Sequence, residues 1–173
     1  MTAEPRPLDD VRATAVAAEL LARYCWAIDD EAYDELRSLF LPDAVADYGA
    51  FRCRGGAEVA DVMAELHRDL RTTQHLLGSV SGRAGDDGRV RVRSHVRATL
   101  VARGGEGARS SRVEVAASYR DLLSHTDGGW RIAERRVDGR WVTGDRTILP
   151  WFDRARRSGG DVRSTDSATS RGT

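Results

Sequence analysis

Apolar residues near the start of the chain recur at the spacing of an amphipathic helix. Asp9 or Asp10, just after Pro7, is a suitable N-cap for this helix. Apolar residues then follow at intervals of three or four positions: Val16, Leu20, Tyr24 and Ala27. The pattern predicts that the chain begins with one helix of several turns.

Two further helices are expected before the chain turns to strands. The second carries Tyr33, Leu36 and Phe40 on one side; Leu41-Pro42 should end it, and Asp43 then opens a turn. Segments 44–51 and 51–55 suit a strand or a hairpin. The third helix follows Gly55-Gly56 and carries an apolar stripe of Val59, Met63, Leu66 and Leu70.

From Gln74 onward the pattern changes to period two. In segment 89–101 the apolar residues alternate with arginines and His95, which should point outward: Val90, Val92, Val96, Ala98 and Leu100. Segment 111–123 carries Val113, Val115, Ala117 and Tyr119 on one face, and segment 130–142 follows a TDGG turn. These segments predict three long antiparallel strands joined by turns.

Helices before and between the first strands, followed by a long meander, favour an α+β layer over an alternating βαβ fold. A twisted sheet of this kind can curl around the helices and leave a ligand cavity at its wide end. Residues 1–150 fit a single domain. Residues 151–173 are rich in Gly, Ser, Thr, Asp and Arg, so we expect a disordered tail.

Composition narrows the possible partners. The 27 basic residues balance the 27 acidic ones, so no overall field attracts nucleic acid or an anionic membrane. The sequence contains no lysine, which excludes a Schiff base and a P-loop lysine.

Cys25 and Cys53 match neither a disulfide framework nor a metal site, and the histidines lack metal-ligand spacing. We expect a cytoplasmic protein without metal or cofactor, with no signal peptide or membrane span.

Three segments together resemble the SnoaL-like, scytalone dehydratase-like group of the NTF2-like superfamily. They are residues 20–51, the TTQHLLGSV run at 72–80 and the DGGWRIAERR run at 127–136, and the resemblance covers residues 12–145. It implies a cone of three helices and a curved, mostly antiparallel sheet that encloses a pocket, and a homodimer formed through the open sheet face. The superfamily includes dehydratases, a dehydrochlorinase, steroid isomerases, polyketide cyclases and proteins without catalysis, so fold alone does not settle function.

The resemblance also implies site residues. The family's A-x-D aspartate falls on Asp29 and its T-Q-H histidine on His75, which in the dehydratase and the dehydrochlorinase form a proton-removing dyad. Tyr48 and Phe51 correspond to a pocket tyrosine and phenylalanine of the dehydratase. A second pocket histidine is replaced by Leu100, which argues against a full copy of the scytalone reaction.

A His–Asp pair is a competent base, because the carboxylate fixes the imidazole tautomer and stabilises the imidazolium that forms. Tyr48 or Tyr119 could donate to the developing anion. Taken separately, however, the sequence favours a surface or satisfied core histidine for His75 and the cap of the next helix for Asp29.

The remaining candidates are residues on predicted apolar faces. Tyr24 and Tyr119 either line the pocket or contribute only to packing. Glu134 alternates with Trp130 and Ile132, and a carboxylate on that face needs a partner or a function, unless a bulge shifts the pattern. We therefore include Tyr24, Tyr119 and Glu134 with Phe51 and Leu100 as candidate substrate-binding residues.

The leading hypothesis is a cofactor-independent lyase, isomerase or cyclase of secondary metabolism. It would remove a proton from a small cyclic or polyketide-like metabolite, with His75 as base, Asp29 as its partner and Tyr48 as electrophile. The alternatives are a non-catalytic small-molecule-binding module and an accessory subunit of a larger enzyme. A separation of more than about 6 Å between the Asp29 and His75 side chains would favour the binding module.

Overall fold

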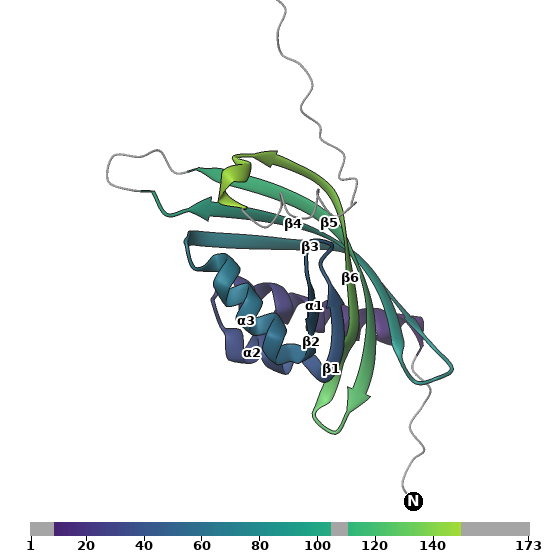
Figure 1. Cartoon of the computed structure of the whole chain (residues 1–173). Helices are drawn as coiled ribbons and strands as arrows, with labels where there is room; N and C mark the ends of the chain where they lie inside the picture. The colour runs from purple at the N-terminus through teal and green to yellow at the C-terminus, as the bar shows by residue number, and fades with distance from the viewer. Residues whose placement is uncertain (1–8, 105–110, 150–173) are drawn as a thin grey trace, which may run out of the picture.

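The computed structural model describes residues 9–104 and 111–149. Its elements follow one another as α1 (Asp10–Asp29), α2 (Tyr33–Ser38), β1 (Phe40–Asp47), β2 (Arg52–Arg54), α3 (Gly55–His67), β3 (Leu70–Ala84), β4 (Val90–Ala102), β5 (Arg112–Thr126), β6 (Gly129–Gly144) and the short 3₁₀ helix η1 (Arg146–Ile148). The helices gather on the inner side of one curved sheet (Figure 1).

The six strands form a single open sheet in the order β2-β1-β6-β5-β4-β3. Neighbouring strands are antiparallel except β1 and β6, which run parallel. Helices on one face of a mostly antiparallel sheet make an α+β architecture, as the sequence predicts.

Helix α1 lies along β3 and is attached to it near both ends. The Asp9 side chain caps α1 by accepting a hydrogen bond from the backbone N–H of Arg12. Near this end, the Thr14 hydroxyl accepts from the N–H of Gly82 at 3.0 Å. A Cβ at Gly82 would lie 2.6 Å from the carbonyl oxygen of Ala13, so the helix approaches the strand this closely only because that residue is glycine.

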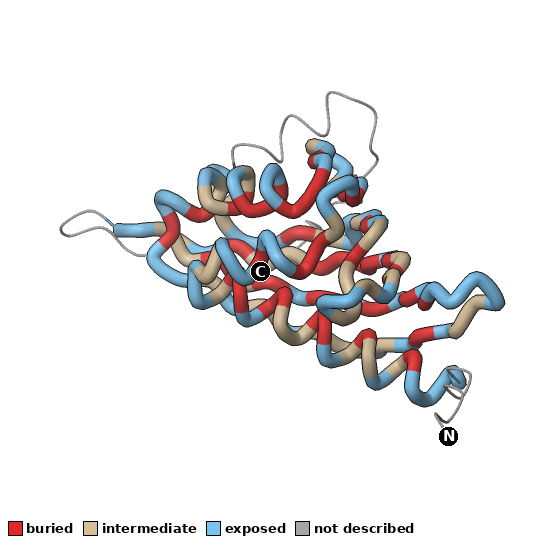
Figure 2. Tube along the Cα trace, turned by 90° about the horizontal axis from the view of Figure 1, so that it is seen from below, coloured by how far each residue is buried: buried red, intermediate tan, exposed pale blue. Residues whose placement is uncertain are grey.

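Buried stretches of the helices and of the strands face one another across the interior (Figure 2). The larger core cluster fills the space between α1, α2, α3 and the sheet. A smaller cluster lies at the end of the sheet covered by η1 and contains Leu70, Ala98, Leu100, Val113, Val142 and Leu149. As predicted, the apolar residues of β4 and β5 share the inner face, and His95 is exposed.

Two predicted boundaries are wrong. The second helix ends at Ser38, and Phe40 is a buried residue of β1. Pro42 and Asp43, where a turn was expected, are exposed positions of the same strand. The pairing of β1 with β6 shifts between Phe40 and Val45, and such an irregularity admits a proline that a regular ladder would exclude. Leu70 begins β3 instead of extending the third helix.

The meander contains four long strands, β3 to β6, where the sequence predicted three. The pairing of β3 with β4 shifts between Gly78 and Ser81, and Ser79 has a φ of 51°. This bulge changes which positions point inward, so odd-numbered residues face the helices from Thr73 to Leu77 and even-numbered residues from Val80 to Ala84. The alternation along β3 is broken in the sequence for this reason. The predicted tail at 151–173 lies outside the described residues, and the single-domain assignment of 1–150 stays a prediction.

Candidate active site

Asp29 and His75 meet where the end of α1 touches the first half of β3. The Nδ1 atom of His75 lies 2.7 Å from Oδ1 of Asp29. The backbone N–H of His75 donates to Oδ2 at 2.7 Å, and the Thr73 hydroxyl donates to Oδ1 at 2.8 Å. Both side chains are largely buried, with 10% of His75 and 12% of Asp29 exposed. The structure thus brings together the two residues that the sequence singled out.

This geometry assigns the imidazole tautomer. A carboxylate only accepts hydrogen bonds, so Nδ1 of His75 carries a proton, and in the neutral ring Nε2 is the nitrogen with the free lone pair. Burial alone raises the pKa of Asp29, but the hydrogen bonds from His75 and Thr73 outweigh it and lower that pKa below its ordinary value. Asp29 therefore stays ionised and can stabilise a positive charge on the ring.

The capping role does not account for Asp29. Asp29 does not cap α2, because the N-cap of that helix is Ala32, which makes no side-chain capping bond. No basic residue lies in the last turn of α1, where the helix dipole favours a cation. A protonated His75 would supply that positive charge.

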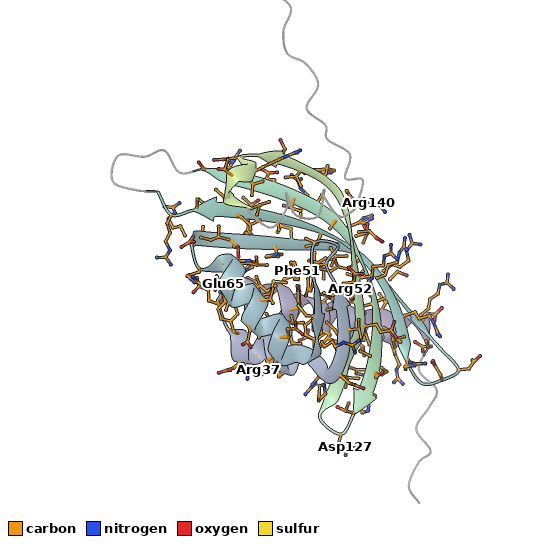
Figure 3. The ribbon with its side chains drawn as sticks, viewed as in Figure 1. Arg37, Phe51, Arg52, Glu65, Asp127 and Arg140 are labelled. Carbon is orange, nitrogen blue, oxygen red and sulfur yellow. The ribbon has the colours of Figure 1, made fainter. Side chains whose placement is uncertain are left out.

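Tyr48 pairs with Tyr24 in the interior. Their hydroxyl oxygens are 3.2 Å apart, and the Tyr48 ring stacks on Phe51 at a centroid distance of 4.9 Å. Tyr24 meets Tyr119 edge to face at 6.1 Å. Burial raises the pKa of Tyr24, Tyr48 and Tyr119, so all three phenols stay protonated. Phe51 lies toward the middle of the molecule, whereas Arg37 and Glu65 lie on the outer side of the helices (Figure 3).

Leu100 is buried on the same face of the sheet as the dyad, since it pairs with Thr73. Its neighbours belong to the smaller core cluster with Val142 and Leu149. That packing gives Leu100 a structural role, and its contact with substrate stays a prediction.

The prediction that Glu134 faces the pocket is wrong, because its side chain is exposed. The pairing of β5 with β6 shifts between Leu122, which faces Glu134, and Leu123, which faces Ile132. This irregularity reverses the alternation, so that Ile132 and Arg135 point inward and Glu134 points outward.

Arg135 is the main interior polar residue that the sequence pattern did not reveal. It is ion-paired to Asp121 through Nε at 2.7 Å and Nη2 at 3.0 Å, and neither side chain is exposed. Its guanidinium lies 4.0 Å from the ring centroid of Tyr24 and 4.4 Å from that of Tyr119. A signal was present, since Asp121 shares the inward parity of Tyr119 and a carboxylate there needs a cationic partner.

His67 is a second buried histidine that the sequence pattern missed. Its Nδ1 donates to the carbonyl oxygen of Met63 at 2.6 Å, one turn back on α3. Burial lowers the pKa of His67 in spite of that bond, and the charges of His75 and Asp29 also act on it. His67 follows Met63 by four residues and so lies on the apolar face of α3. This spacing could have predicted from the sequence that His67 is buried.

An open crevice of about 350 Å³ lies away from the dyad, at the beginning of α1 and the far end of β3. Its walls include Asp10, Thr14 and Gly82, whose polar atoms join the helix to the strand. The crevice is therefore separate from the candidate active site.

The fold and the site define a small α+β protein of the NTF2-like type with a His–Asp pair on the inner face of its sheet. Its sequence matches the SnoaL-like domain model over residues 9–136. The chain therefore belongs to the SnoaL-like domain family, which confirms the resemblance drawn from the sequence. A comparison with curated proteins finds no match.

Similar solved structures agree with this assignment. One is hexachlorocyclohexane dehydrochlorinase (LinA) type 2, with a TM-score of 0.67 and 17% identity, covering 78% of this chain and 90% of that one. Another is a protein of Novosphingobium aromaticivorans DSM 12444 provisionally assigned as scytalone dehydratase, with a TM-score of 0.65 and 20% identity over 76% and 86% of the two chains. A third is a single-residue variant of Rv3472, a function-unknown protein from Mycobacterium tuberculosis, with a TM-score of 0.63 and 23% identity over 84% and 95%. At these identities the likeness shows the fold alone.

No helix in the described parts of the chain is both long and apolar enough to cross a membrane.

Proposed function

We propose that this protein is a cofactor-independent enzyme of the lyase, isomerase or cyclase type that removes a proton from a small cyclic or polyketide-like metabolite. The contact that supports it is the 2.7 Å hydrogen bond between Nδ1 of His75 and Asp29. This distance is well below the separation of about 6 Å that would favour a non-catalytic binding module.

His75 is the general base in this proposal. Its Nε2 takes the proton from an acidic C–H bond, and Asp29 stabilises the imidazolium that results. The carboxylate is held by Thr73 and by the backbone of His75, so the pair is preorganised before substrate arrives. Positioned proton transfer of this kind contributes about 10² to 10⁴ in rate.

Tyr48 is the proposed electrophile, since its protonated phenol can donate to the negative charge that develops on the substrate. The similar structures lend support, because two of them are named for elimination reactions, a dehydrochlorination and a dehydration. A homodimer and a place in secondary metabolism stay proposals drawn from the family resemblance, and a cytoplasmic location stays a proposal drawn from the sequence composition.

The test is hydrogen exchange at carbon, which needs a base and no knowledge of the full reaction. Wild-type protein is incubated with 2-tetralone in D₂O, and α-deuteration is followed by NMR. We expect His75→Gln to slow exchange by about 10² or more, whereas the matched variant His95→Gln, an exposed histidine on β4, keeps the wild-type rate. A folded His75→Gln protein with undiminished exchange would falsify the base assignment.

A further inference from the structure

His67 is a buried histidine that the proposed reaction does not use. It is the last residue of α3, and residues 68 and 69 alone separate it from β3, the strand that carries His75. Glu65 lies on the outer side of α3 (Figure 3), and residues two positions apart on a helix point in nearly opposite directions. The His67 side chain therefore points toward the interior, in agreement with an exposed fraction of 8%.

The imidazole of His67 shares its surroundings with the His–Asp pair. Met63, whose carbonyl oxygen accepts the hydrogen bond from Nδ1 of His67, belongs to the core cluster that also contains Ile28, the residue before Asp29. The charges of Asp29 and of His75 both act on the His67 imidazole, so it lies within electrostatic reach of each partner of the pair. The inner side of the sheet thus holds two neighbouring imidazoles, one from α3 and one from β3.

The two imidazoles have the same tautomer and leave the same nitrogen free. The Met63 carbonyl and the Asp29 carboxylate only accept hydrogen bonds, so each ring carries a proton on Nδ1. In a neutral ring Nε2 is then an acceptor. Within the described parts of the chain, the bond to Met63 is the one hydrogen bond of the His67 side chain, and Nε2 is not among the polar atoms sealed in the interior without a partner. This nitrogen is therefore free to accept a hydrogen bond from a ligand.

The two rings differ in what fixes them. His75 is held by an ionised carboxylate, which stabilises the imidazolium. His67 is held by a neutral carbonyl, and burial lowers its pKa more than that bond and the carboxylates of Asp29 and Glu31 raise it. A positive charge on His75 lowers the pKa of His67 further. His67 thus remains a neutral acceptor while His75 takes up the proton.

We propose that Nε2 of His67 accepts a hydrogen bond from a hydroxyl group of the substrate and so holds the substrate while His75 removes the proton from carbon. This inference rests on the proposed function and adds a hydroxyl group to its substrate class. No proton is transferred at His67, because the substrate hydroxyl keeps its hydrogen and the C–H proton goes to Nε2 of His75. The polarity is opposite to that of Tyr48, which donates.

His67 is a specificity-determining residue in this role. A substrate without the hydroxyl group leaves a partly desolvated nitrogen without a partner, and such a loss weakens binding by about tenfold or more. A purely structural role, in which His67 only satisfies the Met63 carbonyl at the end of α3, affects stability and treats ligands with and without a hydroxyl group alike. Discrimination between such ligands therefore separates the two roles.

The experiment measures binding by isothermal titration calorimetry for 2-tetralone and for 5-, 6-, 7- and 8-hydroxy-2-tetralone, which move the hydroxyl group around the ring. We expect wild-type protein to bind at least one hydroxylated isomer about tenfold more tightly than 2-tetralone. The methyl ether of that isomer keeps the oxygen but has no hydrogen to donate, so it should bind no more tightly than 2-tetralone.

Variants assign the preference to His67. His67→Leu should remove it, and His67→Gln, whose amide oxygen can accept a hydrogen bond, should retain part of it. His95→Leu is the matched control, because His95 is exposed on the other face of the sheet, and it should keep the full preference. Circular dichroism checks the fold of each variant. A folded His67→Leu protein with undiminished preference overturns the proposal, as does wild-type protein that favours no hydroxylated isomer or binds none of the probes.

Nitrogen NMR of the histidine rings tests the same contact without a substitution in the core. We expect Nε2 of His67 to be unprotonated at neutral pH and its resonance to move to lower frequency when the preferred isomer binds, as it does when this nitrogen accepts a hydrogen bond. A proton on Nε2 in the free protein, or a resonance that the preferred isomer leaves in place, contradicts the proposal.

Carbon exchange in D₂O keeps this test separate from the base assignment. If exchange survives in His75→Gln while the hydroxyl preference depends on His67, the base is misassigned but the hydroxyl subsite stands. If exchange is lost in His75→Gln while no change at His67 alters the preference among the probes, the base stands and the role of His67 is structural.

Discussion

The Asp29 carboxylate accepts three hydrogen bonds, all from Thr73 and His75 on β3. One comes from the backbone amide of His75, which His75→Gln leaves in place. Asp29 therefore also fastens the end of α1 to the sheet, in addition to orienting the imidazole.

We predict that Asp29→Asn lowers the stability of the protein most at neutral pH and least in acid. The folded-state pKa of Asp29 lies below its unfolded value, so its contribution is fully present above the unfolded pKa of about 3.9 and is lost as pH falls through the folded pKa. Urea unfolding of wild type and variant at pH 7 and pH 3 checks this. A difference between the two proteins that grows toward pH 3 would contradict the assigned protonation state.

The sequence predicted some residues of the candidate site and missed others. Asp29 and His75 were found because short motifs carry them. Arg135 was missed because inward and outward positions along 130–142 were assigned by simple alternation. The pairing of β5 with β6 shifts within this segment, and the sequence does not mark the shift. The same miscount put Glu134 inside, and a prediction that required every inward carboxylate to have a cation would have found the pair of Arg135 with Asp121.

At the scale of elements, the helices and the strands β4 and β5 followed their sequence periodicity, whereas β3 and β6 did not. The bulge around Ser79 has a clear consequence for the site, because it lets Thr73 and His75 face α1 in the first half of the strand and Gly82 face the same helix in the second half. The contact of α1 with β3 thus spans the bulge, with Asp29 at one end and Thr14 at the other.

That contact depends on the missing side chain of Gly82. We predict that Gly82→Ala lowers the free energy of unfolding by about 1–3 kcal/mol, because its Cβ would lie 2.6 Å from the Ala13 oxygen and 2.8 Å from the Thr14 nitrogen. Gly78→Ala is the matched control on the same strand, since a Cβ there meets nothing within 4 Å. Urea denaturation measures both; equal losses in the two variants would mean that the close approach of α1 does not limit the substitution.

The whole molecule carries equal numbers of acidic and basic residues, yet β4 exposes a row of arginines on the outer face of the sheet. Neighbouring strands supply carboxylates to this face. Arg97 pairs with Glu114 at 2.8 Å and lies 5.2 Å from the ring centroid of Trp141, and Arg120 and Arg136 both reach Asp138. Carboxylates thus pair with Arg97 of β4 and with arginines of β5 and β6 on this face, and Asp87 pairs with Arg91 of β4.

We therefore predict that the protein does not bind nucleic acid. Non-specific binding depends on neutralising several phosphates and releasing their counterions, and arginines already paired with carboxylates release fewer. Fluorescence anisotropy of a labelled DNA duplex should remain flat with micromolar protein at physiological salt. The variant Glu114→Gln with Asp138→Asn is the informative comparison, because it removes carboxylates from this face and leaves its arginines in place. If this variant binds the duplex with strong salt dependence while the wild type does not, local charge pairing is what prevents binding; measurable binding by the wild type would contradict the prediction.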